Sequence, residues 1–303
     1  MALACSAGGQ KSGKTQRTSI HKQPMLFECK SRVCSPAMSS DLHTFWLLCS
    51  PRNLRTDRRT SPIDREAGAA FEKAANIQQS KLSEPDDMAN TLTEAFKVYR
   101  KDSPEDATRV LTTAIANYTS KGSFRRAATH QQNLAEVYEL ELGDTAHALA
   151  AYETAAQWFE SDNAEALANK LYLKVADLAA LEGDYAKSCQ LFESVAKSSL
   201  NSNLMRWSVK DYFLKAGICH LASGDLVATN RALQSYRDLD NSFVQTRENM
   251  LLQDLAEAVE KGEQEMFADK LFQYDQLSKL DKWKTTLLLK VKNGIEEQGE
   301  DFS

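Results

Sequence analysis

The sequence lacks any apolar run long enough to cross a lipid bilayer. A spanning helix needs about 18 or more consecutive apolar residues, and the longest candidate, residues 45–49, is far shorter. The alternation of apolar and polar residues that marks a half-buried β-strand is also missing. We therefore expect no membrane-spanning segment, and we expect helices to dominate a chain with 42% apolar and 26% charged residues.

Cysteine is scarce beyond the first 50 residues. Of six cysteines, only Cys189 and Cys219 lie in the rest of the chain, both at positions that the helical pattern predicts to be buried. Two isolated thiols in a large domain favour a reducing compartment over a disulfide framework.

Enzyme and metal-site patterns are absent as well. Cys29, Cys34, His43 and Cys49 lack the paired short spacings of a structural zinc site. The five histidines have no Asp, Ser or Cys partner at the spacing of a catalytic motif. We predict no catalytic residue, no metal ligand and no bound cofactor.

One motif matches a nucleotide-binding pattern, but its surroundings do not. Gly8-Gly9-Gln10-Lys11-Ser12-Gly13-Lys14-Thr15 fits G-x-x-x-x-G-K-[ST]. A phosphate-binding loop needs a strand before it and a helix after it. Only seven residues precede Gly8, and Pro24 curtails a following helix. We interpret the match as a compositional accident.

Acidic residues are nearly missing from the first 60 positions. Residues 1–60 hold ten Lys and Arg against three Asp and Glu, whereas the remainder holds 27 against 39. The first segment is typical of disorder or of an aberrant first exon, and it also resembles an Arg- and Ser-rich transit peptide. The acidic remainder argues against nucleic acid as a partner.

A helix-pair pattern recurs about every 41 residues in that remainder. The run from Ala107 to Tyr118 aligns with the run from Ala148 to Phe159 and with the run that starts at Ser188. The small or medium residues Ala114, Ala155 and Val195 follow the large residues Leu111, Tyr152 and Phe192 in this frame. Such pairs cannot bury their apolar faces alone, so neighbouring pairs must stack.

Turn signals separate the predicted helices. Glycine fits the residue after a helix, and a following Asp fits the N-cap of the next one. Proline fits the first helical turn after Ser61, and Glu84-Pro85-Asp86 and Asp102-Ser103-Pro104 are further turn signals. The spacing predicts helices of about 14–18 residues from about Ser61 to near the end of the chain.

Basic residues recur on the second helices of successive predicted pairs. In a stack of helix pairs, equivalent positions form a ladder along one face. That ladder would orient an elongated acidic partner, although solvated surface charge explains the same residues equally well. The residues are Arg125, Arg126, Lys170, Lys174, Lys210, Lys215 and Arg247.

Several segments together resemble the alpha-SNAP family of soluble NSF attachment proteins, in its fungal vesicular-fusion branch. The run Trp207-Ser208-Val209-Lys210-Asp211-Tyr212-Phe213-Leu214-Lys215 is similar to that family's signature. Supporting segments are Phe124-Arg125-Arg126, Ala168-Asn169-Lys170, Leu280-Asp281-Lys282-Trp283 and the ending Glu300-Asp301-Phe302-Ser303.

The resemblance implies an all-α fold and a non-catalytic adaptor. The fold would be a TPR-like α-solenoid over 61–225, followed by a C-terminal helical bundle with an acidic tail over 226–303. The adaptor would bind the assembled SNARE complex of syntaxin-type, SNAP-25-type and synaptobrevin-type helices. It would then recruit the NSF hexamer, an AAA+ ATPase that disassembles the complex in vesicle fusion and protein transport, including transport between the endoplasmic reticulum and the Golgi.

The resemblance also assigns residues to two surfaces. The SNARE-binding side would comprise Arg125, Arg126, Lys170, Lys174, Trp207, Lys210 and Arg247. The side that binds or stimulates NSF would comprise Glu257, Glu260, Asp301 and Phe302, with Phe302 where the family usually has Leu.

The first 60 residues depart from the family. The family's N-terminal hairpin with its membrane-inserting aromatic loop is not found there, and the flanks of Phe45-Trp46-Leu47-Leu48 do not resemble that loop. We expect a cytoplasmic protein that is peripheral on vesicle, Golgi, endoplasmic reticulum or vacuole membranes. A generic TPR-like scaffold for another helical or peptide partner fits the repeat period equally well.

Overall fold

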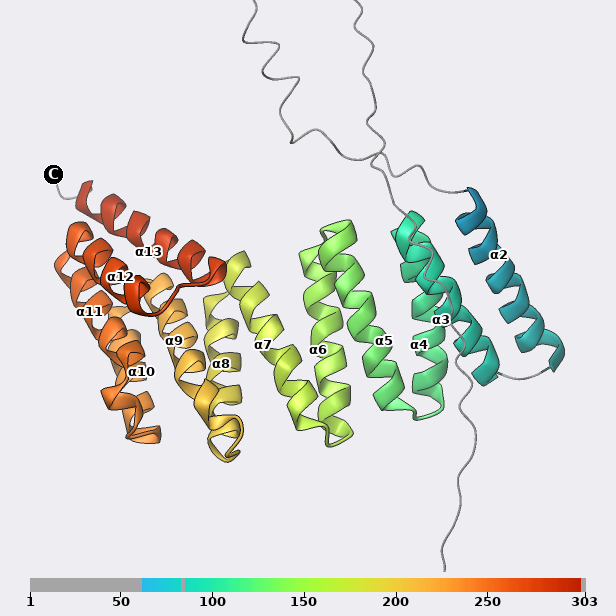
Figure 1. The fold of residues 1–303 in the computed structure, drawn as a ribbon, viewed down its shortest axis with the longest axis horizontal. Helices are drawn as coiled ribbons and strands as arrows, with labels where there is room; N and C mark the ends of the chain where they lie inside the picture. Colours follow the sequence, from blue (N-terminus) through green and yellow to red (C-terminus); the bar gives the residue numbers. More distant parts are fainter. Residues whose placement is uncertain (1–61, 83–84, 301–303) are drawn as a thin grey trace, which may run out of the picture. The chain divides into compact units, whose positions relative to one another are not determined.

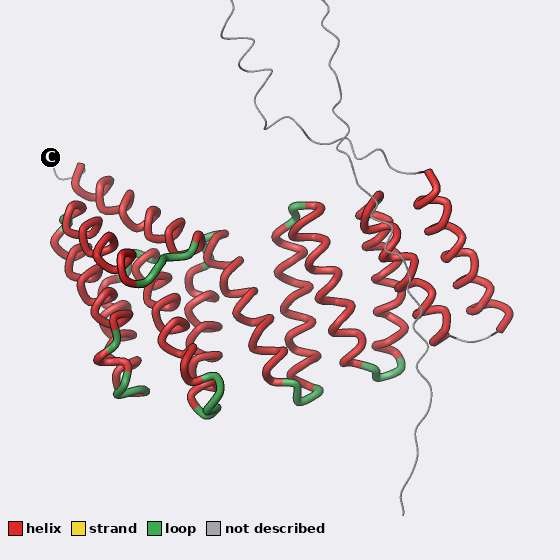
Figure 2. Tube along the Cα trace, viewed as in Figure 1, coloured by secondary structure: helices red, strands yellow, loops and turns green. Residues whose placement is uncertain are grey.

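The computed structural model describes residues 62–82 and 85–300, and within these ranges it consists of helices joined by short turns (Figures 1 and 2). The all-α prediction is confirmed for this part of the chain, which contains no strand. The segment 1–60, with its Gly8–Thr15 motif, lies outside the described residues. Elements from the first half of the chain are α2 (Pro62–Ile77), η2 (Gln78–Leu82), α3 (Pro85–Asp102), α4 (Pro104–Ser120), α5 (Phe124–Val137), η3 (Tyr138–Leu142) and α6 (Thr145–Ser161).

The second half continues in the same manner. Its elements are α7 (Glu165–Glu182), α8 (Tyr185–Leu200), α9 (Arg206–Ala222), α10 (Leu226–Leu239), η4 (Phe243–Gln245), α11 (Arg247–Lys261), α12 (Gln264–Leu277) and α13 (Lys282–Glu300).

Local chemistry explains where these helices begin and end. Three aspartates cap helix N-termini, each accepting a hydrogen bond from the backbone N–H three residues later: Asp144 from His147, Asp184 from Lys187 and Asp225 from Ala228, at 2.8–3.1 Å. Gly183 follows α7 with φ of 97°, a left-handed conformation that glycine adopts without steric cost. The predicted turn signals are thus confirmed.

The repeat frame correctly predicts the buried positions. Ala114 and Ala155, the small residues of the frame, are fully buried. Leu111 and Phe192, two of the large residues that stand three positions earlier in the frame, are fully buried as well. Consecutive helices pack against each other from α2 to α9. Small residues at these contacts let neighbouring helices approach closely, which is how each pair covers the apolar face of the next.

Buried side chains form three clusters that follow one another along the chain. The first extends from Ala75 to Val137, the second from Ala128 to Leu178 and the third from Ala176 to Ile295. The described residues, 62–82 and 85–300, belong to one compact unit. The predicted division at 225/226 stays a prediction, since the third cluster includes residues on both sides of it.

Helix α13 returns along the chain instead of extending the row. It packs against α12, α9 and α7, and Figure 1 shows its first turns beside α7. Helix α9 therefore has neighbours on several sides, and residues all along it are buried.

Candidate partner-binding surfaces

The predicted basic residues lie on the second helices of the pairs, α5, α7, α9 and α11. Lys170 on α7 and Arg247 at the start of α11 are exposed, and neither forms an ion pair with another described residue. An unpaired, solvated cation keeps its donors available for an acidic partner. These two positions are the clearest candidates for contact with such a partner.

Trp207 is the most exposed aromatic side chain in the described part of the chain, at 83%. It lies in the first turn of α9, where it borders a groove of about 500 Å³ together with Arg206, Lys210, Phe243 and Thr246. The Lys210 Nζ lies 3.1 Å from a carboxylate oxygen of the largely buried Glu248. The exposed indole of Trp207 lies beside the cations of Arg206 and Lys210, which suits a helical partner that carries both apolar and acidic side chains.

The two arginines at the start of α5 are partly engaged within the chain. Arg126 stacks over the ring of Tyr118, with its guanidinium carbon 4.5 Å from the ring centroid, and donates to the Asn90 side chain at 2.6 Å. Arg125 is exposed, 3.8 Å from a carboxylate oxygen of Asp162. Arg126 is therefore held in one orientation, whereas Arg125 has only a weak surface ion pair.

Two further lysines of the predicted ladder are paired. The Lys174 Nζ lies 2.6 Å from Glu139 and stays partly exposed. The Lys215 side chain is only 15% exposed, because it turns inward to Asp177 at 2.8 Å. The expectation of an exposed cation is wrong at Lys215, whose aromatic surroundings stabilise an inward position.

The acidic residues predicted for the second surface lie on α11. Glu257 and Glu260 are exposed along a groove of about 330 Å³ between α10 and α11. Lys261 donates to Glu257 at 2.5 Å, and this hydrogen bond lowers the pKa of the Glu257 carboxyl. Asp301 and Phe302 lie outside the described residues.

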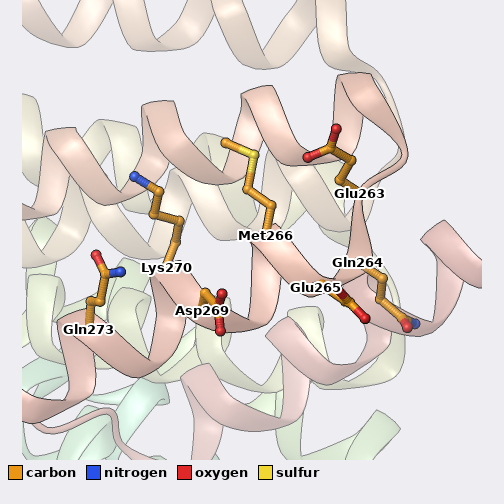
Figure 3. A pocket seen from close by; sticks show the side chains of 7 residues that line it. All are labelled: Glu263, Gln264, Glu265, Met266, Asp269, Lys270 and Gln273. Atoms are coloured by element: carbon orange, nitrogen blue, oxygen red, sulfur yellow. The ribbon is translucent and has the colours of Figure 1, made fainter.

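Sequence analysis did not single out a hollow at the start of α12. Figure 3 shows its lining, with Met266 and Lys270 projecting in the same direction from the helix. The hollow measures about 550 Å³, and its Lys270 pairs with Asp254 at 3.2 Å. The concentration of Glu and Gln after Gly262 is the sequence signal for it. Its lining residues are Glu263, Gln264, Glu265, Met266, Asp269, Lys270 and Gln273.

Residues 62–82 and 85–300 contain no group of three His, Cys, Asp or Glu side chains placed to hold a metal ion. Within the same ranges, none of the helices combines the length and apolar character that crossing a bilayer requires.

His130 on α5 gives these helices a pH dependence. Its ring stacks on Tyr118 with centroids 5.3 Å apart, and its Nδ1 is buried without a hydrogen-bond partner among the described residues. Burial lowers the pKa of His130, and the nearby charges of Arg126 and Lys97 lower it further. The fold therefore disfavours protonation of this imidazole, whereas the unfolded chain takes up a proton near the ordinary pKa.

Acidification should consequently destabilise the protein. The contribution of His130 is present above its unfolded pKa and is lost as the pH falls through that value towards the lowered folded pKa. We expect the Tm to decrease between about pH 7.5 and about pH 5.5, and to decrease less in His130→Gln. Thermal melts followed by circular dichroism check this. Equal slopes for the two proteins would contradict it.

Comparison with known proteins gives a consistent result. The sequence model of a family described as "Soluble NSF attachment protein, SNAP" matches residues 59–296. A probable vesicular-fusion protein sec17 homolog from Schizosaccharomyces pombe is 54% identical over 237 residues, covering 78% of this chain and 82% of the relative. A probable sec17 homolog from Neurospora crassa is 53% identical, covering 81% and 84%. The human alpha-soluble NSF attachment protein is 37% identical, covering 78% and 79%.

Proposed function

Because the chain belongs to the soluble NSF attachment protein family, we propose that it is a non-catalytic adaptor for SNARE disassembly. It binds the assembled SNARE four-helix complex and brings the NSF hexamer to it. The names of its relatives, vesicular-fusion protein and NSF attachment protein, support this role. The corresponding location is the cytoplasm, with peripheral attachment to vesicle, Golgi, endoplasmic reticulum or vacuole membranes through the bound SNAREs.

The observation that carries the proposal is the open basic and aromatic surface on α7, α9 and α11. Trp207 is exposed in the first turn of α9, and Lys170 and Arg247 are exposed cations on the neighbouring second helices. A SNARE bundle is a rod with an acidic surface, and complementary charge along a row of helices would align it. Glu257 and Glu260, together with the tail residues Asp301 and Phe302, are proposed to contact and stimulate NSF.

A charge-reversal experiment tests this surface. Lys170→Glu combined with Arg247→Glu should weaken capture of a preassembled SNARE bundle about tenfold, or about 1.4 kcal/mol. Both side chains are exposed and outside any ion pair among the described residues, so helicity should not change. Capture is measured at about 0.1 M salt, and the loss should shrink at about 0.5 M because ions screen exposed charges.

A matched variant controls for the change in net charge. Lys73→Glu with Arg231→Glu makes the same charge change at exposed positions on the first helices α2 and α10. It should capture the SNARE bundle like the unmodified chain. Equal capture by the two double variants would exclude the second-helix face as the contact surface.

A further inference from the structure

Helix α13 is fastened to α7 and α9 by polar contacts between residues far apart in the sequence. The indole Nε1 of Trp283 donates to the backbone carbonyl of Asp177 at 2.8 Å, across 106 residues. The Lys284 Nζ donates to the Asp211 carboxylate at 2.5 Å, across 73 residues. We call Asp177, Asp211, Lys215, Trp283 and Lys284 the α13 clasp.

Lys215, on α9, contacts both α7 and α13 within the clasp. Its Nζ lies 2.8 Å from the Asp177 carboxylate and 4.9 Å from the centroid of the Trp283 ring. Trp283 in turn meets Phe192 edge to face, with centroids 5.8 Å apart. Burial raises the pKa of Asp177, and the Lys215 ammonium opposes that shift by favouring the carboxylate. The indole, the ammonium and the carboxylate thus hold each other in one arrangement.

Lys284 makes a second attachment beside the first. Its side chain is 10% exposed, and it lies between Asp211 and Asp281 at 2.5 and 3.6 Å. Asp281 also accepts the backbone N–H of Lys284 at 2.7 Å and so caps the start of α13. Apolar side chains of similar volume would provide equal or greater stability at such a place. An ion pair with a nearly buried lysine instead fixes direction, because only one placement of α13 satisfies it.

Two of the helices that the clasp joins, α7 and α9, carry residues of the proposed SNARE-binding surface, and the third, α13, precedes the tail residues proposed to stimulate NSF. Asp177 follows Lys174 by one helical turn on α7, and Asp211 follows Lys210 directly on α9. Helix α13 extends to Glu300 and leads into the tail residues Asp301 and Phe302. The family signature around Trp207 therefore has exposed members for a partner. It also has two members, the half-exposed Asp211 and the largely buried Lys215, whose contacts within the chain form part of the clasp.

We propose that the α13 clasp consists of positioning residues that hold α13, the helix that precedes Asp301 and Phe302 in the sequence, at a fixed place relative to the SNARE-binding helices. This inference rests on the proposed adaptor function. With the clasp closed, α13 keeps one orientation relative to a captured SNARE bundle when the complex meets the ATPase. With it loosened, α13 changes its orientation relative to α7 and α9, so the effective concentration at the ATPase of the residues that follow it falls although no contact residue is lost.

The test uses Lys284→Met in the full chain. Methionine fills the same buried volume, and Asp211, half exposed, stays solvated, so the fold should persist. We expect SNARE capture within twofold of the unmodified chain and stimulated ATP hydrolysis by the NSF hexamer lowered about fivefold at saturating adaptor. A chain ending at Asp301 sets the floor for stimulation, and Lys284→Arg, which keeps the ion pair, should restore it.

A readout independent of both partners accompanies these assays. Hydrogen exchange of the α13 backbone in the free protein should quicken in Lys284→Met and not in Lys284→Arg. Quickened exchange with undiminished stimulation would overturn the proposal, and so would unchanged exchange. If Lys284→Met does not fold, Trp283→Phe decides by the same criteria, since it removes the hydrogen bond to Asp177 and keeps an aromatic ring at this position. Failure of the unmodified chain to capture SNAREs would instead overturn the adaptor function.

Discussion

Replacing Phe213 by Ala is expected to lower the free energy of unfolding by about 3–5 kcal/mol. Phe213 is fully buried on α9. Its ring stacks on Tyr236 with centroids 4.6 Å apart and meets Phe243 edge to face at 5.3 Å. The substitution removes the central ring of three and leaves a cavity that the surrounding helices cannot easily fill, since α8, α10, α11 and α13 all contact α9.

Urea unfolding followed by circular dichroism measures this loss. Phe272→Ala is the matched control, because it removes the same ring from a position that is 66% exposed and should change stability by no more than about 0.5 kcal/mol. Similar unfolding midpoints for the two variants would show that the three rings around Phe213 are not a centre of stability.

Gly217→Val is expected to destabilise the fold by about 2–3 kcal/mol through overpacking. A Cβ atom at Gly217 would lie 2.6 and 2.7 Å from the two methyl groups of Leu252, closer than van der Waals contact allows. Leu252 is fully buried on α11 and cannot turn away into solvent. The close approach of α9 and α11 therefore requires glycine at this position.

A second substitution checks that Leu252 causes the strain. Leu252→Ala alone should be destabilising, but in the Gly217→Val background it should cost much less, giving a favourable coupling in a double-mutant cycle. Gly294→Ala is the control for the loss of glycine, since nothing lies within 4 Å of an added Cβ there. It should be neutral or slightly stabilising within a helix. Additive effects of the first two substitutions would contradict the clash.

Features that depend on residues close together in the sequence could be predicted from it. The 41-residue frame identified buried positions such as Ala114 and Phe192, and the Gly-Asp turn signals located helix boundaries such as Gly183 and Asp184. Both depend on contacts within a helix pair or with the next one. Cys189 and Cys219 were also correctly predicted to be buried.

Contacts between distant segments could not be predicted in the same way. Lys215 lies 41 residues after the partly exposed Lys174, at the equivalent position of the repeat. The Asp177 carboxylate and the Trp283 ring, which comes from the remote α13, favour its inward position. Trp283 itself lies in a segment that resembles the family, but the sequence does not indicate which residue it contacts. Helical periodicity specifies which face is apolar, but it does not specify which remote helix covers that face.

The return of α13 to α7 also sets an order of events during synthesis. Helices α2 to α6 can pair with their neighbours soon after each is translated, because their contacts are local. Asp177, in contrast, must wait while 106 further residues are added before Trp283 can reach it. At about 5–20 residues per second, that delay is roughly 5–20 s. During this interval α7, and α9 once it is made, expose the apolar residues that α13 later covers, and a chaperone that binds apolar surface would protect them.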